Sequence, residues 1–376
     1  MLSFKERAIS LLKKADVKIN GDRPWDIQVY NDKLYERTLL GGTIAFGEAY
    51  MDGWWSAEKL DQFFAKILGA YLDEELKSPI LLFYYLKSAL FNPQTEKKAF
   101  KVGEVHYDIG NDLYSKMLDK RMVYTCGYWD GFQDIPPASN LDEAQENKLE
   151  IICRKIGLKK GDNVLDIGCG WGSFIRYAAE KYQANCVGIS VSKKQVDYGN
   201  KSKGDLSIEY RLQDYRDIDE KFDHIVSVGM FEHVGYKNYK TYMEVVNKNL
   251  KDDGLFLLHT IGCNISTTAT DPWINKYIFP NSMLPSAAQI SKSVENLFVI
   301  EDWHNFGINY DHTLMSWYNN FKKYWPDIKG HYNERFYKMW EFYLLSSAAT
   351  FRIRRNQVWQ IVLSKHGIKD GYKRIV

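Results

Sequence analysis

The stretch VLDIGCGWGSF, residues 164–174, decides the fold that we expect for this chain. Its opening residues are apolar and favour a buried strand, and Gly168, Gly170 and Gly172 then alternate with other residues. Glycines let the backbone turn tightly and approach a ligand closely, and the helix expected next directs its N-terminus at that ligand. Asp166, just before the turn, is well placed to face an ammonium group. We therefore predict a cofactor-binding turn, with a plain strand-to-helix connection as the alternative.

The spacing of this turn is G-x-G-x-G, whereas a dinucleotide-binding fingerprint places its third glycine one position later, at Ser173 in this chain. At the end of the next strand an acidic residue usually binds ribose hydroxyls, and the neutral side chains of Ser190 and Gln195 stand there instead. After the third strand, Asp214 is placed to accept a hydrogen bond from an adenine amino group, and Tyr215 to stack on the ring. A surface turn is the alternative for these two residues.

Strands and helices are expected to alternate around this motif. The candidate strands are 163–167, 186–190, 208–213, 224–228 and 255–259, and the candidate helices are 172–182, 193–203 and 238–250. Strands separated in this way by helices indicate a doubly wound α/β fold, with a mostly parallel sheet covered on both faces. In such folds the ligand binds beyond the carboxyl ends of the strands, so we expect the functional residues at that edge.

The region before this pattern is different in character. Residues 4–15 place apolar side chains on one helical face, residues 39–55 are rich in glycine and aromatic residues, and residues 61–68 read as a helix. After Asn92 and Pro93, the polar segment 94–101 reads as a linker. We therefore predict a smaller, mainly helical domain at 1–99 and a second domain at 100–376.

Composition narrows the possible partners. The net charge of +2 argues against a nucleic-acid partner held by bulk electrostatics. The five cysteines show no C-x-x-C pair, and no leader is evident, so we expect a cytoplasmic protein. The longest apolar run, residues 80–86, is far shorter than the roughly 18 residues that a membrane span needs. Any contact with lipid is therefore expected from the surface.

Further segments resemble cyclopropane-fatty-acyl-phospholipid synthases and the related mycolic acid cyclopropane synthases. Besides the glycine motif, they are HYDIGNDLY (106–114), YTCGYW (124–129), QDYRD (213–217), SVGMFEHVG (227–235), LLHTIG (257–262), DPWINKYIFP (271–280) and EDWHNFGINYDHTLMSWY (301–318). The resemblance runs from about residue 106 to 362. More weakly, residues 1–99 resemble the N-terminal lipid-binding domain of the bacterial phospholipid enzymes. The resemblance implies the S-adenosylmethionine-dependent methyltransferase fold, with S-adenosylmethionine as methyl donor and no metal.

The resemblance also implies a reaction. The methyl carbon of S-adenosylmethionine is added to the cis double bond of an unsaturated phospholipid acyl chain, a carbocation forms, and loss of a proton closes a cyclopropane ring. Such a site must exclude water, stabilise the cation with aromatic faces and hold a base within reach of the departing proton. Aromatic residues in the matching segments that could serve this purpose are Tyr124, Tyr128, Trp129, Phe231, Tyr310 and Trp317.

The site residues follow from the same resemblance. Cys126, Glu232, His259 and Tyr310 are implied to be catalytic and, with the backbone of Ile261, to bind a bicarbonate ion that acts as the base. Glu232 beside an anion requires a shared proton or a charged His259, and Glu232 itself is the alternative base. Tyr124 and Thr125 are implied to join the glycine turn and the residues after the next two strands in binding the cofactor.

Each of these residues also has a structural interpretation: Cys126 as a buried apolar residue, Glu232 as a helix cap and His259 as a core histidine. The sequence departs from the family at Ser347, where a cysteine is common, and at Gly127, where an alanine is common. The former puts a covalent mechanism through that position in doubt.

Two other functions remain open: an S-adenosylmethionine methyltransferase for another lipid or a small acceptor, and a non-catalytic lipid-binding protein. The expected partners are a phospholipid bilayer, met peripherally at the inner face of the cell membrane, and a second copy of the chain in a homodimer. The basic segment 320–376, with Arg352, Arg354 and Arg355 close together, is a candidate for contact with anionic head groups.

Overall fold

The computed structural model describes residues 3–75, 92, 94 and 111–376. The chain divides into two compact units. The first unit comprises 1–92, 268–281 and 314–356, and the second comprises 93–267, 282–313 and 357–376. Two later segments of the chain therefore belong to the same compact unit as the N-terminal residues, whereas a single division after residue 99 was predicted from the sequence. Apart from Gln94, the predicted linker lies outside the described residues, as do His106 and Tyr107 of the first matching segment.

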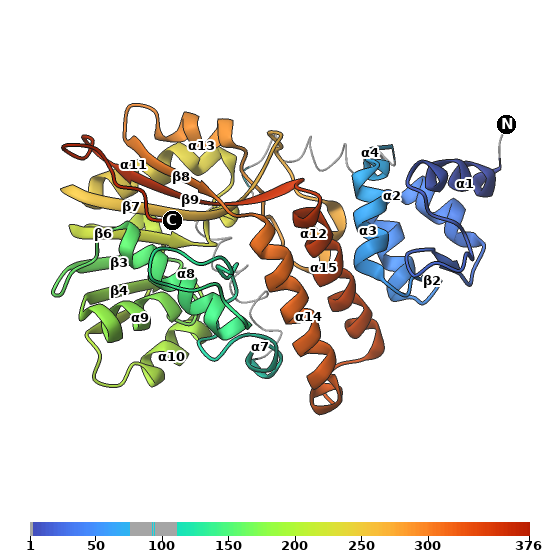
Figure 1. Cartoon of the computed structure of the whole chain (residues 1–376), viewed down its shortest axis with the longest axis horizontal. Coiled ribbons are helices and arrows are strands. Elements are labelled where there is room, and N and C mark those ends of the chain that lie inside the picture. The colour runs from blue at the N-terminus through green and yellow to red at the C-terminus, as the bar shows by residue number, and fades with distance from the viewer. Residues whose placement is uncertain (1–2, 76–91, 93, 95–110) are drawn as a thin grey trace. The chain divides into compact units, whose positions relative to one another are not determined.

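The second unit is built on a seven-stranded sheet with the order β5-β4-β3-β6-β7-β9-β8 (Figure 1). The strands are β3 (Asn163–Ile167), β4 (Asn185–Ser190), β5 (Ile208–Leu212), β6 (Phe222–Val228), β7 (Leu250–Cys263), β8 (Val299–Asn305) and β9 (Asn356–Ser364). Strands β3 to β7 pair in parallel, and β8 pairs with β9 in antiparallel fashion. All five predicted strands are confirmed, and β3, which leads into the glycine turn, lies inside the sheet.

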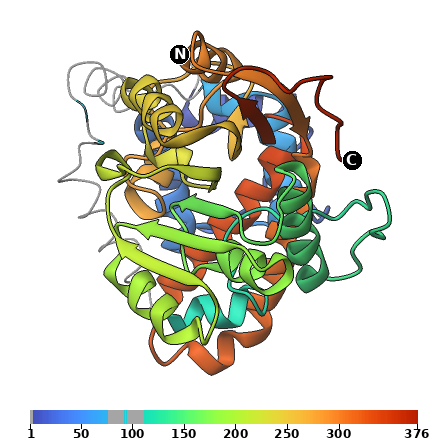
Figure 2. The same cartoon turned by 90° about the vertical axis from the view of Figure 1, so that its left-hand side faces the viewer.

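Helices cover both faces of this sheet, which can be followed from the side in Figure 2. They are α8 (Leu141–Lys155), α9 (Ser173–Tyr182), α10 (Lys193–Ser202), α11 (Tyr239–Asn249) and α13 (Ala287–Val294). The unit also contains α7 (Asn111–Met117) and the start of α14 (Ile308–Ile328). Neighbouring residues of β3 enter opposite cores: Val164 packs with residues of α8, α9 and α10, and Leu165 with residues of α11 and α13. This alternation confirms the predicted doubly wound fold.

The first unit is mainly helical, as predicted. Its elements are α1 (Phe4–Lys14), β1 (Gln28–Val29), α2 (Lys33–Met51), β2 (Trp55–Ser56), α3 (Leu60–Gly69), α4 (Leu72–Glu75), α12 (Pro272–Tyr277), α15 (Glu334–Arg352) and the rest of α14. Aromatic rings form much of its interior: Trp55 stacks on Phe46 with ring centroids 4.3 Å apart, and Phe342 lies 4.4 Å from Trp273. In this unit these aromatic rings therefore serve packing.

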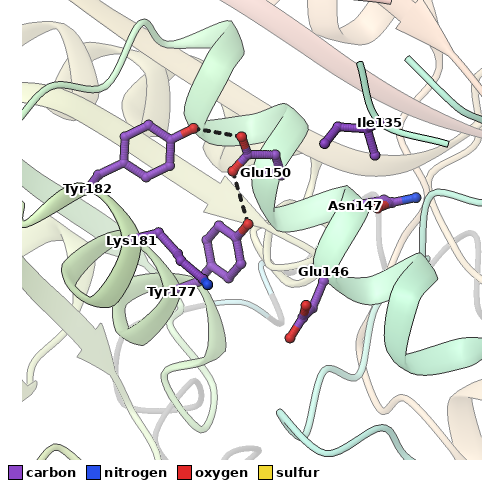
Figure 3. A pocket seen from close by; sticks show the side chains of 7 residues that line it. All are labelled: Ile135, Glu146, Asn147, Glu150, Tyr177, Lys181 and Tyr182. Carbon is purple, nitrogen blue, oxygen red and sulfur yellow. Dashed lines mark hydrogen bonds between the residues drawn. The ribbon is translucent and has the colours of Figure 1, made fainter. Parts of the chain in front are cut away.

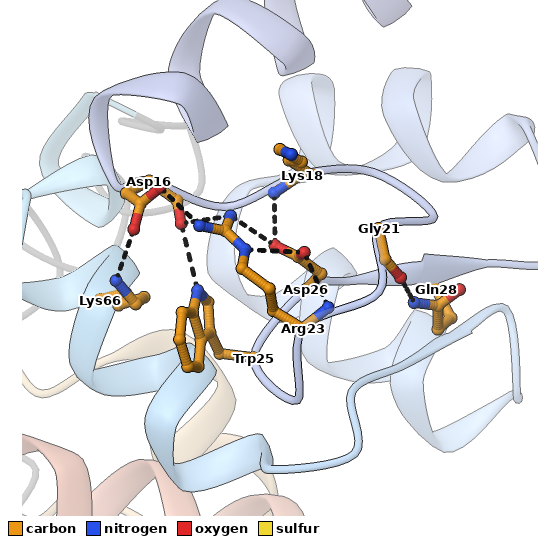
Figure 4. Close-up of polar contacts among 8 residues, drawn as sticks. All are labelled: Asp16, Lys18, Gly21, Arg23, Trp25, Asp26, Gln28 and Lys66. Atoms are coloured by element: carbon orange, nitrogen blue, oxygen red, sulfur yellow. Dashed lines mark hydrogen bonds and ion pairs between the residues drawn. The ribbon is translucent and has the colours of Figure 1, made fainter.

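Charged side chains in the first unit are largely engaged with one another. Figure 4 shows Arg23 between the carboxylates of Asp16 and Asp26, at 2.7 and 2.8 Å. Arg352 bonds Asp61 at 2.7 Å, and Arg355 bonds Asp73 at 2.7 Å. Two of the three arginines considered for head-group contact are therefore already ion-paired within their own unit.

No helix in the described part of the chain is long and apolar enough to cross a membrane. All five cysteines are free thiols, and four of them, Cys126, Cys153, Cys169 and Cys186, are buried.

Candidate active site

The glycine turn joins β3 to α9, as the sequence predicts. Gly168, Gly170 and Gly172 have φ values of 83°, 55° and 82°, in the left-handed region that favours glycine. A methyl group added at Gly168 would lie 2.5 Å from Met230, and one at Gly172 would lie 2.0 Å from the Tyr210 hydroxyl. At Gly170 the nearest atom is Gln195 Nε2, at 4.0 Å. Gly170 is thus the position in the turn where the backbone has room for a ligand.

Asp166 lies at the carboxyl end of β3 and is 2% exposed. Burial raises the pKa of its carboxyl to about 7, and the charge of Lys148 opposes this effect. Its Oδ1 has no hydrogen-bond partner among the residues that the structure describes. A buried oxygen without a donor is costly, and the ammonium group of a ligand would satisfy it. The residue therefore fits the amino-acid part of S-adenosylmethionine.

Ser190 and Gln195 are brought together at the end of β4. Ser190 Oγ donates to Gln195 Oε1 at 2.8 Å, and both side chains are buried. This bond fixes the amide so that Nε2 is the group nearest Gly170. Gln195 is therefore held with a hydrogen-bond donor directed at the open part of the turn.

Asp214 and Tyr215 follow β5, but their side chains are engaged within the protein. Asp214 accepts from the backbone N of Arg216 and from its guanidinium, each at 3.0 Å. The Tyr215 ring is buried, packs edge-on against Tyr242 with centroids 5.0 Å apart, and is covered by the Arg216 guanidinium at 4.5 Å. The roles of both residues toward adenine stay predictions.

The segment 124–129 is held against α8 by two residues that the sequence analysis missed. Gln145 Nε2 donates to the carbonyl of Thr125 at 2.8 Å, and Lys148 Nζ donates to its hydroxyl at 2.9 Å. Lys148 is 1% exposed, and burial lowers its pKa to about 8. A methyl group on Gly229, which follows β6, would lie 2.4 Å from Thr125 Cγ2. The segment therefore rests on the carboxyl edge of the sheet, as expected of a cofactor-binding element.

Cys126 is fully buried in this segment. Burial raises the pKa of its thiol well above the ordinary value, so the group is neutral near pH 7. Its Sγ donates to Gly127 O at 3.1 Å and lies 4.0 Å from Thr313 Oγ1. A neutral thiol is a hydrogen-bond donor, which suits contact with an anion.

Glu232 and Ile261 are brought together because β6 and β7 are adjacent parallel strands. Glu232 Oε1 accepts from Ile261 N at 2.6 Å. Burial raises the pKa of Glu232 to about 7 despite this bond, and Oε2 has no hydrogen-bond partner among the described residues. Glu232 therefore has one oxygen anchored and one available, and it can share a proton near neutral pH. The Ile261 N–H is meanwhile committed to Glu232.

His259 lies near the carboxyl end of β7 and is buried. Burial lowers the pKa of His259 well below its usual value, helped by Lys148 and Lys155, so the ring is neutral. Its Nδ1 lies 3.4 Å from Gln360 Nε2. Two arrangements would allow Glu232 to lie beside an anion: a positively charged His259, or a proton shared between Glu232 and the anion. Burial disfavours the charged form of His259, so the shared proton is the arrangement that remains.

Aromatic rings connect His259 to the Cys126 segment. Phe306 lies 5.7 Å from His259 and 5.3 Å from Tyr128, measured between ring centroids. Tyr310 is 7% exposed in the first turns of α14, and α14 bonds the same segment through Thr313, which accepts from Gly127 N at 3.1 Å. The predicted residues from four parts of the sequence thus converge on one edge of the sheet. Trp317 belongs to the first unit.

A surface pocket also lies between α8 and α9 (Figure 3). Glu150 at its centre already accepts hydrogen bonds from the hydroxyls of Tyr177 and Tyr182, at 2.9 Å each. None of the predicted site residues lines this pocket, so it is separate from the candidate active site.

Comparisons with known proteins identify the family of this chain. The family model described as mycolic acid cyclopropane synthetase matches residues 94–361. The chain is 49% identical to the cyclopropane-fatty-acyl-phospholipid synthase of Escherichia coli K12 over 367 residues, which cover 97% of this chain and 94% of that protein. It is 36% identical to sphingolipid C9-methyltransferase A of Emericella nidulans, over 69% of this chain and 53% of that protein.

Solved structures show the same relationship. The cyclopropane synthase MmaA2 from Mycobacterium tuberculosis superposes with a TM-score of 0.65 at 28% identity, covering 71% of this chain and 98% of that one. The mycolic acid cyclopropane synthase CmaA1, solved in complex with SAH and CTAB, gives a TM-score of 0.65 at 30% identity, covering 71% of this chain and 98% of that one. The chain therefore belongs to the mycolic acid cyclopropane synthetase family of S-adenosylmethionine-dependent enzymes.

Proposed function

We propose that this enzyme adds the methyl carbon of S-adenosylmethionine across the cis double bond of an unsaturated phospholipid acyl chain and closes a cyclopropane ring. The near-full-length similarity to the Escherichia coli protein supports this substrate class. The observation that carries the chemistry is the buried, anchored carboxyl of Glu232, with a pKa of about 7. It follows β6, at the same edge of the sheet as the glycine turn that follows β3.

The cofactor is held by residues at the carboxyl ends of β3 and β4. The orphaned oxygen of Asp166 binds its ammonium group, Gly170 gives its backbone room, and Gln195 offers a donor. When bound, S-adenosylmethionine supplies an electrophilic methyl group on a positively charged sulfur. Tyr124, Thr125, Asp214 and Tyr215 complete the proposed set.

The protein's own part in the reaction is to keep water away and to receive one proton. The walls around Cys126 and His259 are aromatic and closely packed, through Tyr128 and Phe306, and such rings stabilise a cation by roughly 0.5–2 kcal/mol each. Two carbon–carbon bonds form, while the sulfur–methyl bond of S-adenosylmethionine, the π bond of the alkene and one carbon–hydrogen bond of the transferred methyl group break. The proton leaves toward Glu232 Oε2 or an acceptor beside it.

We propose bicarbonate as that acceptor, held by Cys126, Glu232, His259, Tyr310 and the backbone of Ile261. The neutral imidazole has one hydrogen to donate, the neutral thiol can turn its hydrogen from Gly127 O toward the ion, and Glu232 can share a proton with the anion because its pKa is raised. Ile261 N would then divide its bond between Glu232 and the ion. The alternative base is Glu232 alone.

The enzyme must reach lipid in a bilayer. We propose that residues 1–99 form a lipid-binding domain and that the enzyme acts peripherally at the inner face of the cell membrane as a homodimer. Exposed apolar side chains of the first unit, including Phe4, Ile9, Leu40 and Tyr71, support contact with lipid. This contact can be tested by vesicle flotation of variants in which one of these side chains is replaced by a charged one.

A second candidate function is methylation of a lipid acyl or sphingoid chain without ring closure. The similarity to the Emericella nidulans sphingolipid C9-methyltransferase A favours it. The two reactions differ in how many hydrogens of the methyl group are retained, which gives a direct test.

The test uses S-adenosylmethionine with a fully deuterated methyl group and vesicles of unsaturated phospholipid, followed by mass spectrometry of the acyl chains. Ring closure leaves two deuterium atoms in a saturated product, whereas methylation leaves three in a product that keeps its double bond. Vesicles of saturated phospholipid serve as the control. Absence of any labelled acyl chain would contradict both functions.

A further inference from the structure

The segment that carries Cys126 is bonded to α14 through one hydroxyl. Thr313 Oγ1 accepts from Gly127 N at 3.1 Å and from Trp129 Nε1 at 3.0 Å, and it donates to Asn309 O at 2.8 Å. A hydroxyl has one hydrogen to donate and two lone pairs, so all three are in use. Thr313 is fully buried, and water cannot replace these bonds.

These bonds determine where the thiol of Cys126 can point. Its shorter contact is to Gly127 O at 3.1 Å, and Thr313 Oγ1 lies 4.0 Å from Sγ. Because both lone pairs of the hydroxyl are occupied, Thr313 is a weak competitor for the thiol hydrogen. Its effect on Cys126 therefore comes through Gly127, whose peptide it fixes.

The same helical turn carries Tyr310. Asn309 Oδ1 accepts from Trp129 N, and Asn309 Nδ2 donates to Asp130 at 2.9 Å. Asn309 and Thr313 are four residues apart and share a helix face, with Tyr310 directly after Asn309. One turn of α14 thus makes three hydrogen bonds to the Cys126 segment and a fourth to Asp130, the residue that follows it, while it presents Tyr310.

We propose that Thr313 is a positioning residue for the transfer reaction, whose hydroxyl sets the thiol of Cys126 relative to Tyr310. The inference rests on the proposed function, in which both groups donate to the proton acceptor. Thr313 itself touches no reacting atom. Its loss is expected to affect the chemical step rather than cofactor binding, since Thr125 is held separately by α8.

The experiment compares Thr313→Val, which removes the hydroxyl and keeps the shape, with Thr313→Ser, which keeps the hydroxyl. Two buried N–H groups lose their acceptor in the valine variant, so we expect kcat to fall about tenfold to a hundredfold. We expect the KM for S-adenosylmethionine to change less than about threefold and the serine variant to recover most of kcat. Thr350→Val is the matched control, because its hydroxyl also bonds within a helix, to Ser347 O at 2.7 Å.

A double-mutant cycle separates positioning from a general loss of structure. If Thr313 acts through Cys126, Thr313→Val has little further effect in a Cys126→Ala background. An equal loss in both backgrounds, or full activity of Thr313→Val, would overturn the inference. If instead Cys126→Ala is itself fully active, the proposed role of Cys126 has failed. Binding of S-adenosylhomocysteine by calorimetry reports that each variant is folded, and Thr313→Ala replaces the valine variant if that one does not fold.

Discussion

Replacement of Glu232 by glutamine is expected to stabilise the folded protein at alkaline pH while it abolishes turnover. Glu232 is 6% exposed, and burial raises its pKa from 4.5 to about 7. Between these two values the folded state keeps a proton that the unfolded chain has lost. The stability contributed by the protonated carboxyl is therefore complete below pH 4.5 and is lost as the pH rises through 7.

The size of the effect follows from the two pKa values. A difference between 4.5 and about 7, at about 1.4 kcal/mol for each pH unit, corresponds to about 3 kcal/mol. Glutamine cannot ionise, and its amide oxygen can still accept from Ile261 N, which lies 2.6 Å from Glu232 Oε1. The stability of Glu232→Gln relative to the unaltered protein should thus increase across this range and level off above it.

Urea unfolding, followed by tryptophan fluorescence at several values between about pH 5 and pH 8, measures this difference. Glu244→Gln, an exposed position on α11, controls for the change of net charge. Calorimetry with S-adenosylhomocysteine should show binding retained, while acyl-chain mass spectrometry shows no product. Equal stability of variant and parent at about pH 8 would refute the burial argument, and full activity would remove Glu232 from the reaction.

Three further outcomes are expected. Asp166→Asn should weaken S-adenosylhomocysteine binding about tenfold or more, measured by calorimetry, because an amide cannot pair with an ammonium group as a carboxylate does; unchanged affinity would exclude that contact. Lys148→Met should raise the KM for S-adenosylmethionine at pH 7, because Thr125 loses a bond of 2.9 Å and the pKa of Asp166 rises further; a KM equal to that of the parent enzyme would assign Lys148 to packing alone. Gly172→Ala should cost more stability in thermal unfolding than Gly204→Ala, since both have positive φ but only Gly172 faces an atom, Tyr210 Oη at 2.0 Å; equal losses would attribute the effect to φ.

Much of the fold was predictable because the periodicity of apolar residues and the positions of glycines indicate the same boundaries of strands and helices. Each predicted strand from 163–167 to 255–259 lies within or overlaps an observed one. The two strands of this sheet that were not predicted are β8 and β9, which follow α13 in the chain and form one side of the sheet. Strand β8 reads VIEDWHN, in which Glu301 and Asp302 are adjacent and His304 follows after Trp303, so no alternation of apolar and polar residues identified it as a strand.

The candidate site was predictable at the ends of strands and less so elsewhere. Gly168 directly follows β3 and Ser190 is the last residue of β4, so both places could be predicted once the strands were recognised. The environment of Asp214 was harder to predict. Its carboxylate accepts a hydrogen bond from Arg216, and that pairing depends on a turn that the sequence does not specify.

The two buried lysines of α8 were not predicted, although the spacing of residues in this helix indicates them. Lys148 and Lys155 are seven residues apart in α8, on the face that carries Leu149 and Ile152 into the core. Charged residues at helical spacing on an apolar face indicate buried functional or structural groups. Thr313 gives no such signal, because threonine is ordinary in a helix and its role depends on a segment far away in the sequence.

The thiols of this protein have a practical consequence for labelling. Alkylating reagents and oxidants attack the thiolate, and burial raises the pKa of all five cysteines, including the half-buried Cys263. Maleimide dyes should therefore react slowly with the native chain near neutral pH. A single surface cysteine, introduced for fluorescence or spin-probe measurements at a bilayer, could then be modified selectively without first removing the natural ones.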